Sequence, residues 1–151
     1  MCGGESDVAK TPGIRRLLEA MKSNRNEAAV VGVDDYFQRS IEAGKFVIPR
    51  CEDCGRHHFY PRILCPHCGS ANLRWVEPSG RGTVHSTTAV HRRSGEPYNV
   101  ALVDLDEGPR LMTNVTGIEP AAVRIGMPVL AVIDTAAAAG PLLVFEPREE
   151  Q

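Results

Sequence analysis

The first 32 residues combine a polar start with one short apolar stripe. Thr11-Pro12 can open a helix, with Thr as the cap and Pro in the first turn. Four apolar residues then follow at helical spacing: Ile14, Leu17, Leu18 and Met21. A helix of about ten residues is not stable alone in water. We therefore interpret residues 1–32 as a flexible or partner-docking extension.

A second helix is predicted just before the sequence changes to strand patterns. Asp34 is its expected N-cap, and Gly44 is its expected stop. Its apolar positions are Tyr36, Phe37 and Ile41. The helix should therefore pack one apolar face on the body of the protein.

Short apolar runs with turn residues between them predict a mainly β protein after this helix. Phe46–Ile48 and Leu73–Val76 look like short strands flanking a cysteine-rich segment. From Glu77 onward the pattern predicts five strands, with one helical turn near Glu119–Val123 before the fourth. The expected strands are Thr83–His91, Asn99–Leu105, Leu111–Thr116, Val129–Ile133 and Leu142–Phe145. This order favours a small closed sheet of the OB type.

Four of the five cysteines form two matched Cys-x-x-Cys knuckles, each followed by glycine. They are Cys51, Cys54, Cys65 and Cys68. A two-residue gap lets one tight turn direct both sulfurs at a single ion, and two such turns give a closed four-sulfur site. The glycines permit the positive backbone angle that turns amide N–H groups toward the sulfurs. The spacing predicts structural zinc, although the ligands alone leave iron open.

A closed four-thiolate site has no position for a substrate, so we expect the metal to stabilise the fold rather than to catalyse. Three histidines, His57, His58 and His67, lie near the knuckles, and we interpret them as ordinary ribbon residues. Cys2 lies in the polar start and is expected to be a bystander.

Composition and charge limit the function classes further. Hydrophobic residues make up 42% of the 151 residues, and the net charge is −2, values typical of a folded soluble protein. A general nucleic-acid binder would need a surplus of Lys and Arg. No apolar run reaches the length of a membrane span, and no basic-plus-apolar leader is visible, so we expect a cytoplasmic location. The segment 33–76 is interpreted as helix plus ribbon, and 77–151 as the barrel.

Candidate contact residues cluster in the ribbon, and the sequence shows no recognisable catalytic set. Arg50, Arg56 and Arg62 could meet phosphates, because a guanidinium matches phosphate oxygens in two-point fashion. Phe59 and Tyr60 fit two roles, either surface anchors for a partner or the small core beneath the metal site. Arg92-Arg93 fits an anion contact or an ordinary solvated loop.

The chain resembles the DUF35 family through a series of motifs in order. These are Pro49-Arg50-Cys51, Phe59-Tyr60-Pro61-Arg62, Cys65-Pro66-His67-Cys68-Gly69-Ser70, Trp75 to Val84, Pro97-Tyr98, Val103 to Thr113 and Arg124 to Val129. The resemblance covers Asp34 to about Phe145 and implies a rubredoxin-like zinc ribbon joined to a five-stranded OB-fold.

The resemblance also implies that the chain is an accessory subunit of a thiolase-superfamily enzyme. Such enzymes cleave or form C–C bonds of acyl-CoA and include thiolases, acyltransferases and aldolases. The partner would carry the nucleophile, and this chain would support it and help form the passage for CoA and substrate. We then expect no activity from the chain alone, no nucleic acid and no membrane among its partners. An OB-fold and ribbon protein that binds nucleic acid, and a stand-alone redox or acyl-transfer enzyme, are the alternatives.

Overall fold

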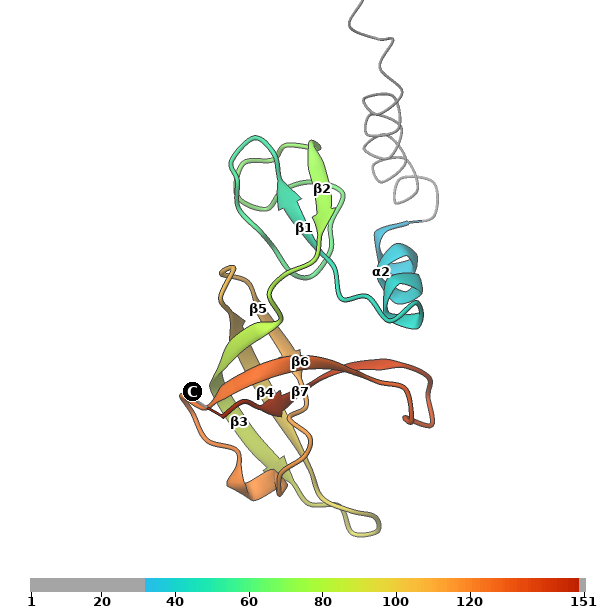
Figure 1. Cartoon of the computed structure of the whole chain (residues 1–151), viewed down its shortest axis with the longest axis vertical. Helices are drawn as coiled ribbons and strands as arrows, with labels where there is room; N and C mark the ends of the chain where they lie inside the picture. Colours follow the sequence, from blue (N-terminus) through green and yellow to red (C-terminus); the bar gives the residue numbers. More distant parts are fainter. Residues whose placement is uncertain (1–31, 150–151) are drawn as a thin grey trace, which may run out of the picture.

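The computed structural model describes residues 32–149, in which a short helix and a two-stranded ribbon stand above a five-stranded barrel (Figure 1). The apolar stripe predicted at Ile14–Met21 lies outside the described residues. The described chain is mainly β, as the sequence predicted. Its helix is α2, Val33–Glu42.

The N-cap of helix α2 lies two residues before the predicted one. Gly32, with φ of 87°, is the N-cap residue, and the helix start has no side-chain cap hydrogen bond. The prediction that Asp34 caps the helix is therefore wrong. Asp34 and Asp35 instead lie in the first turn, where a carboxylate interacts favourably with the helix dipole.

The predicted stop at Gly44 is confirmed. Its φ of 77° lets its N–H reach the carbonyl of Ile41 at 2.9 Å. The N–H of Lys45 then reaches the carbonyl of Ser40 at 2.8 Å, which completes a Schellman motif.

The ribbon consists of β1 (Ile48–Cys51) and β2 (Leu73–Val76), which pair antiparallel. Pro49 lies opposite Trp75, and Trp75 packs with Val47 against α2. The ring centroids of Tyr36 and Trp75 are 4.7 Å apart. Helix α2 therefore covers one face of the ribbon, as its apolar residues predicted.

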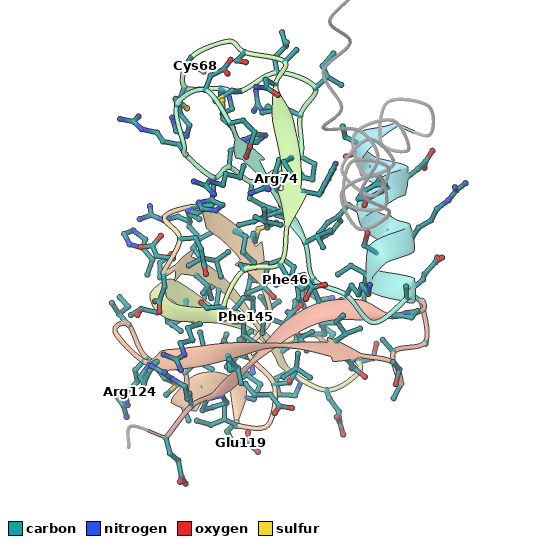
Figure 2. All side chains as sticks on the ribbon, turned by 45° about the horizontal axis from the view of Figure 1, so that its top comes forward. Phe46, Cys68, Arg74, Glu119, Arg124 and Phe145 are labelled. Carbon is teal, nitrogen blue, oxygen red and sulfur yellow. The ribbon has the colours of Figure 1, made fainter. Side chains whose placement is uncertain are left out.

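The opposite face of the ribbon joins the barrel core. Ile48, directly across from Val76, is fully buried and belongs to the same cluster as Val103 and Phe145. Phe46 packs against this cluster at the junction of ribbon and barrel (Figure 2). Because the two parts share one hydrophobic core, the ribbon is held in a defined orientation on the barrel.

The five predicted barrel strands are all present, each within a few residues of its expected bounds. They are β3 (Arg81–Val90), β4 (Tyr98–Leu105), β5 (Arg110–Thr113), β6 (Pro128–Asp134) and β7 (Leu142–Pro147). Their order is β5-β4-β3-β6-β7, and all pairs are antiparallel. A 3₁₀ turn, Pro120–Ala122, precedes β6 as predicted. A parallel bridge between Val115 and Phe145 closes the sheet into an OB-type barrel.

Strand β4 shows the alternation that fills a barrel. Asn99, Ala101, Val103 and Leu105 are buried, while the residues between them are half-buried. Across from them, a Cβ on Gly82 would lie 2.6 Å from Val103 Cγ1 and 2.8 Å from the Asp104 carbonyl. Glycine at this position lets β3 and β4 approach closely.

Candidate metal centre and the ribbon surface

The two cysteine knuckles have the same backbone geometry. Gly55 and Gly69 have φ of 73° and 75°, and each donates its N–H to the carbonyl of the first cysteine at 2.9 Å. Each first cysteine donates its own N–H five residues ahead, Cys51 to Arg56 at 2.9 Å and Cys65 to Ser70 at 2.8 Å. The sequence prediction that glycine makes these turns possible is thus confirmed.

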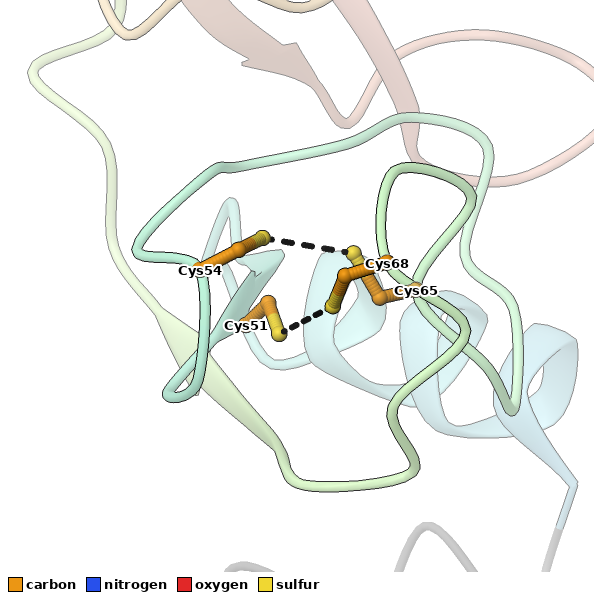
Figure 3. Close-up of side chains that lie close together, drawn as sticks. All are labelled: Cys51, Cys54, Cys65 and Cys68. Atoms are coloured by element: carbon orange, nitrogen blue, oxygen red, sulfur yellow. Dashed lines mark hydrogen bonds between the residues drawn. The ribbon is translucent and has the colours of Figure 1, made fainter.

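The four sulfurs converge on one point between the knuckles (Figure 3). All lie within 4.8 Å of one another, and two pairs, Cys51–Cys68 and Cys54–Cys65, are 3.5 and 3.6 Å apart. Zinc–sulfur bonds of about 2.3 Å in a tetrahedron place the sulfurs about 3.8 Å apart. The donor set and its spacing therefore fit a closed zinc site.

The electrostatics of the cluster also point to a cation. Burial opposes ionisation of Cys65, but backbone hydrogen bonds from His67 and Cys68 outweigh it, so its pKa falls to about 7. A backbone hydrogen bond from Ser70 favours the Cys68 thiolate, yet hydrogen bonds with the neighbouring thiols and burial raise its pKa to about 12. Four thiolates this close are therefore stable together only around a positive ion.

Hydrogen bonds hold the two knuckles in register beside the sulfurs. The carboxylate of Asp53, between the first two cysteines, accepts hydrogen bonds from the Ser70 hydroxyl and, at 3.0 Å, from Asn72 Nδ2. Both bonds lower the pKa of Asp53, and the bond from Ser70 has the larger effect. The backbone N–H of Glu52 also donates to the Asn72 carbonyl at 2.9 Å. These hydrogen bonds therefore help to position the four sulfurs for a metal ion.

The histidines near the knuckles stay outside the sulfur cluster. Within residues 32–149, the four cysteines form the one group of possible metal ligands. His58 is buried, and its backbone N–H donates to the Pro49 carbonyl at 3.1 Å. Burial lowers the pKa of His58, and His67 and Arg62 lower it further, so the imidazole is neutral at pH 7.

The two predicted aromatic candidates have different surroundings. Phe59 packs partly against the barrel core and meets the Phe37 ring edge-on, with centroids 5.5 Å apart. Tyr60 is 57% exposed, and it is the one exposed aromatic residue in the described part of the chain. Phe59 therefore has a core role, although it packs on the barrel core rather than on a separate small core beneath the metal site, whereas the Tyr60 side chain lies on the surface.

The predicted arginines fall into two distant groups. Arg50 lies in β1 opposite Arg74, while Arg56 and Arg62 are exposed in the ribbon loops. Arg92 and Arg93 follow β3 in the turn to β4, at the end of the barrel away from the ribbon (Figure 1). The guanidinium of Arg92 lies 4.7 Å from the Tyr98 ring centroid, a cation–π contact.

Two surface features were missed in the sequence. Ile63 and Leu64, just before the second knuckle, are 74% and 48% exposed. Asp104 accepts a two-point contact from Arg110, at 2.5 and 3.0 Å, and lies 3.3 Å from His85 Nδ1. Asp104 and Arg110 lie directly opposite each other on β4 and β5, six residues apart, and their opposite charges on either side of the turn were the available signal for the second feature.

No helix within residues 32–149 has the length and apolarity needed to cross a bilayer.

Two family models match consecutive parts of the chain. Residues 41–74 match the rubredoxin-like zinc ribbon domain of ChsH2, and residues 75–134 match its C-terminal OB-fold domain.

Several known proteins are similar to this chain. A DUF35 domain-containing scaffold protein of Pyrococcus furiosus is 36% identical over 102 residues, 64% of this chain and 74% of that protein. A probable enoyl-CoA hydratase alpha subunit of Thermomonospora curvata is 38% identical over 113 residues, 72% of this chain and 35% of the subunit. The chain thus spans about a third of that subunit.

A chain in the solved structure of the Ltp2-ChsH2(DUF35) aldolase is 39% identical, with a TM-score of 0.65, over 74% of this chain and 91% of that one. Matched knuckles on a two-stranded ribbon, fused to an OB-type barrel through a shared core, define the class as zinc ribbon plus OB-fold proteins. The chain belongs to the DUF35 family.

Proposed function

We propose that this chain is a non-catalytic accessory subunit that binds a thiolase-like partner. The partner would act on C–C bonds of acyl-CoA and would be a thiolase, an acyltransferase or an aldolase. The observation that carries the proposal is the similarity to a chain of the Ltp2-ChsH2(DUF35) aldolase over 91% of that chain's length. The name scaffold protein, borne by the Pyrococcus relative, supports the same role. The similarity to a probable enoyl-CoA hydratase alpha subunit over 72% of this chain agrees with a role beside an enzyme that acts on acyl-CoA.

The zinc ribbon is the part best suited to contact a partner. Cys51, Cys54, Cys65 and Cys68 would hold the metal, which supplies folding free energy to a segment too small to fold alone. Ile48 anchors the ribbon in the barrel core, so its loops are presented in a fixed orientation. A preorganised surface loses less conformational entropy when it binds.

Tyr60 and Arg62 are the proposed anchors of this contact. Both side chains are exposed on the loop between the knuckles, whereas Phe59 supports the loop from beneath. Tyrosine and arginine are the residue types that most often dominate interface energies. Arg92 and Arg93, at the far end of the barrel, could contact a partner only through a second surface.

Shaping the passage for CoA and substrate is the finer part of the proposal. Arg50, Arg56 and Arg62 belong to a ribbon whose segment 45–76 carries a charge of +3 before the thiolates and metal are counted. Guanidinium groups bind phosphate oxygens in two-point fashion. These three arginines are therefore the candidates for contact with the phosphates of a CoA thioester that the partner holds.

The test is to co-express the full chain with a candidate thiolase-like protein from the same organism and to measure co-purification, zinc content and acyl-CoA cleavage or condensation. Tyr60→Ser with Arg62→Glu should lower the affinity at least tenfold, because two central anchors are lost. Arg93→Glu at the far end is the matched control and should keep the complex. Failure of the unmodified pair to associate, or turnover by this chain alone, would overturn the proposal.

A further inference from the structure

An open apolar groove lies between the start of helix α2 and the second knuckle. It encloses about 520 Å³, and its lining consists of Val33 from the helix and a stretch of the second-knuckle loop, with Arg62, Ile63, Leu64, Cys65, Pro66 and Gly69. Most of these side chains are apolar. The groove adjoins the sulfur cluster through Cys65, which belongs to both.

The residues lining the groove expose much apolar surface. Ile63 is 74% exposed and Leu64 is 48% exposed, and they are neighbours in the chain. Removing a large aliphatic side chain from water lowers the free energy of the protein. Exposed apolar side chains gathered along a groove are a common feature of interaction sites.

The position where the described chain begins indicates what covers the groove. The structure describes the chain from Gly32, one residue before Val33, which itself lines the groove. The 31 preceding residues contain one apolar stripe at helical spacing, Ile14, Leu17, Leu18 and Met21. Residues 22–31 link this stripe to the groove, and ten residues can span up to about 33 Å.

We propose that the apolar stripe of residues 14–21 binds in this groove within the same chain, against Ile63 and Leu64. A short linker gives the stripe an effective concentration in the millimolar range at the groove, so a weak contact suffices. About ten residues cannot hold a helix in water without a surface to pack on. The groove supplies that surface, and the stripe removes Ile63 and Leu64 from water.

This inference goes beyond the proposed function, because it concerns the free subunit and needs no partner. It assigns a role to the N-terminal segment and makes it part of the ribbon surface. Of the two proposed partner anchors, Arg62 lines the groove and Tyr60 does not.

Methyl NMR of the full-length zinc-loaded chain tests the inference directly. We expect nuclear Overhauser effects between the Ile63 methyls and the methyls of Leu17 and Leu18. Leu17→Asp with Leu18→Asp should abolish them and shift the Ile63 and Leu64 signals. Arg16→Asp is the matched control, because it changes the charge of the same segment by an equal amount and leaves the stripe intact; its Ile63 signals should match the unmodified chain. Unchanged methyl signals of the buried Val103 show that each variant keeps the barrel.

Two results would overturn the inference. In one, the Ile63 and Leu64 signals of the double variant equal those of the unmodified chain, whether or not a partner later binds there. In the other, the contacts appear only between differently labelled copies in an isotope-filtered experiment, which would make a second copy the occupant. A reciprocal variant, Ile63→Ser, should release the signals of Leu17 and Leu18 if the contact is within one chain.

Discussion

The side-chain amide of Asn99 hydrogen-bonds to both backbone groups of Val115. Val115 N–H donates to Asn99 Oδ1 at 2.8 Å, and Asn99 Nδ2 donates to the Val115 carbonyl at 2.6 Å. On the other side of the chain, Asn114 and Thr116 bond to the backbone of Phe145. The pairing of β4 with β5 ends at Ala101 and Thr113, so Asn99 replaces a missing strand partner where the barrel closes.

Replacement of Asn99 should therefore destabilise the barrel. Asn99→Ala leaves the Val115 N–H and carbonyl buried without a partner, and we expect a loss of roughly 3 kcal/mol in the free energy of unfolding. Urea unfolding followed by circular dichroism measures this. Thr116→Ala, which removes one long hydrogen bond of 3.4 Å to Phe145, is the control and should cost much less. Equal stability of the two variants would contradict the role given to Asn99.

A second prediction concerns the close approach of β3 and β4. Gly82→Ala places a methyl group 2.6 Å from Val103 Cγ1 and 2.8 Å from a backbone carbonyl, and the backbone oxygen cannot move aside easily. We expect a loss of about 2 kcal/mol, typical of overpacking. Ser86→Ala in the same strand adds no atom and is the control. If Gly82→Ala unfolds at the same urea concentration as the unmodified chain, the strands can separate more readily than the structure indicates.

The sequence predicted the helix stop, the five barrel strands and the cysteine cluster because each has a local signal. Paired knuckles with glycine specify the sulfur cluster, and Gly44 specifies the end of α2. The cap was missed because Asp34 looks like an N-cap in sequence, whereas the positive φ of Gly32 sets the true start.

Other features depend on contacts between distant residues and leave little trace in the sequence. The exposure of Ile63 and Leu64 follows from how the ribbon loop folds back, and neighbouring apolar residues look the same whether buried or exposed. The separation of Arg92 and Arg93 from the ribbon arginines likewise follows from the barrel topology. The shared core through Ile48 could not be predicted from a pattern that suggested separate segments.

The surface carboxylate of Asp104 predicts a defined pH dependence. The Arg110 side chain, which donates to Asp104 at 2.5 and 3.0 Å, lowers the pKa of Asp104 below 3.8. The stabilisation is therefore complete above pH 3.8 and is lost as the pH falls through the lower pKa of the folded state. Because the Asp104 side chain is 39% exposed, solvent screening limits it to under about 1 kcal/mol.

Asp104→Asn should accordingly lower the stability at pH 6 and cost less at pH 2.5, because the stabilisation by the carboxylate is lost as the pH falls through its lowered pKa. Urea unfolding at both pH values measures the difference. Asp106→Asn, on the exposed turn after β4, is the matched control and should change the stability little at either pH. A deficit of Asp104→Asn that is the same at pH 2.5 and pH 6 would show that the charge of Asp104 is not its source.

The last prediction concerns the metal. Cys51→Ser and Cys68→Ser each leave three thiolates, and an alcohol is a much weaker zinc ligand, so the zinc content should fall from one ion per chain to a small fraction. Binding free energy on the order of 10 kcal/mol is at stake in such sites. Because Cys51 is buried in β1, three residues after Ile48 of the barrel core, we expect the midpoint of thermal unfolding to fall as well, and partner binding to be lost with the metal.

Elemental analysis of the purified chain, thermal unfolding and co-purification measure the three effects. Cys2→Ser, which replaces the one cysteine that is not part of a Cys-x-x-Cys motif, is the matched control and should keep the full metal content. A metal-free Cys68→Ser chain that still binds its partner would refute the structural role of the site, and iron in place of zinc would appear as visible absorption in the unmodified protein.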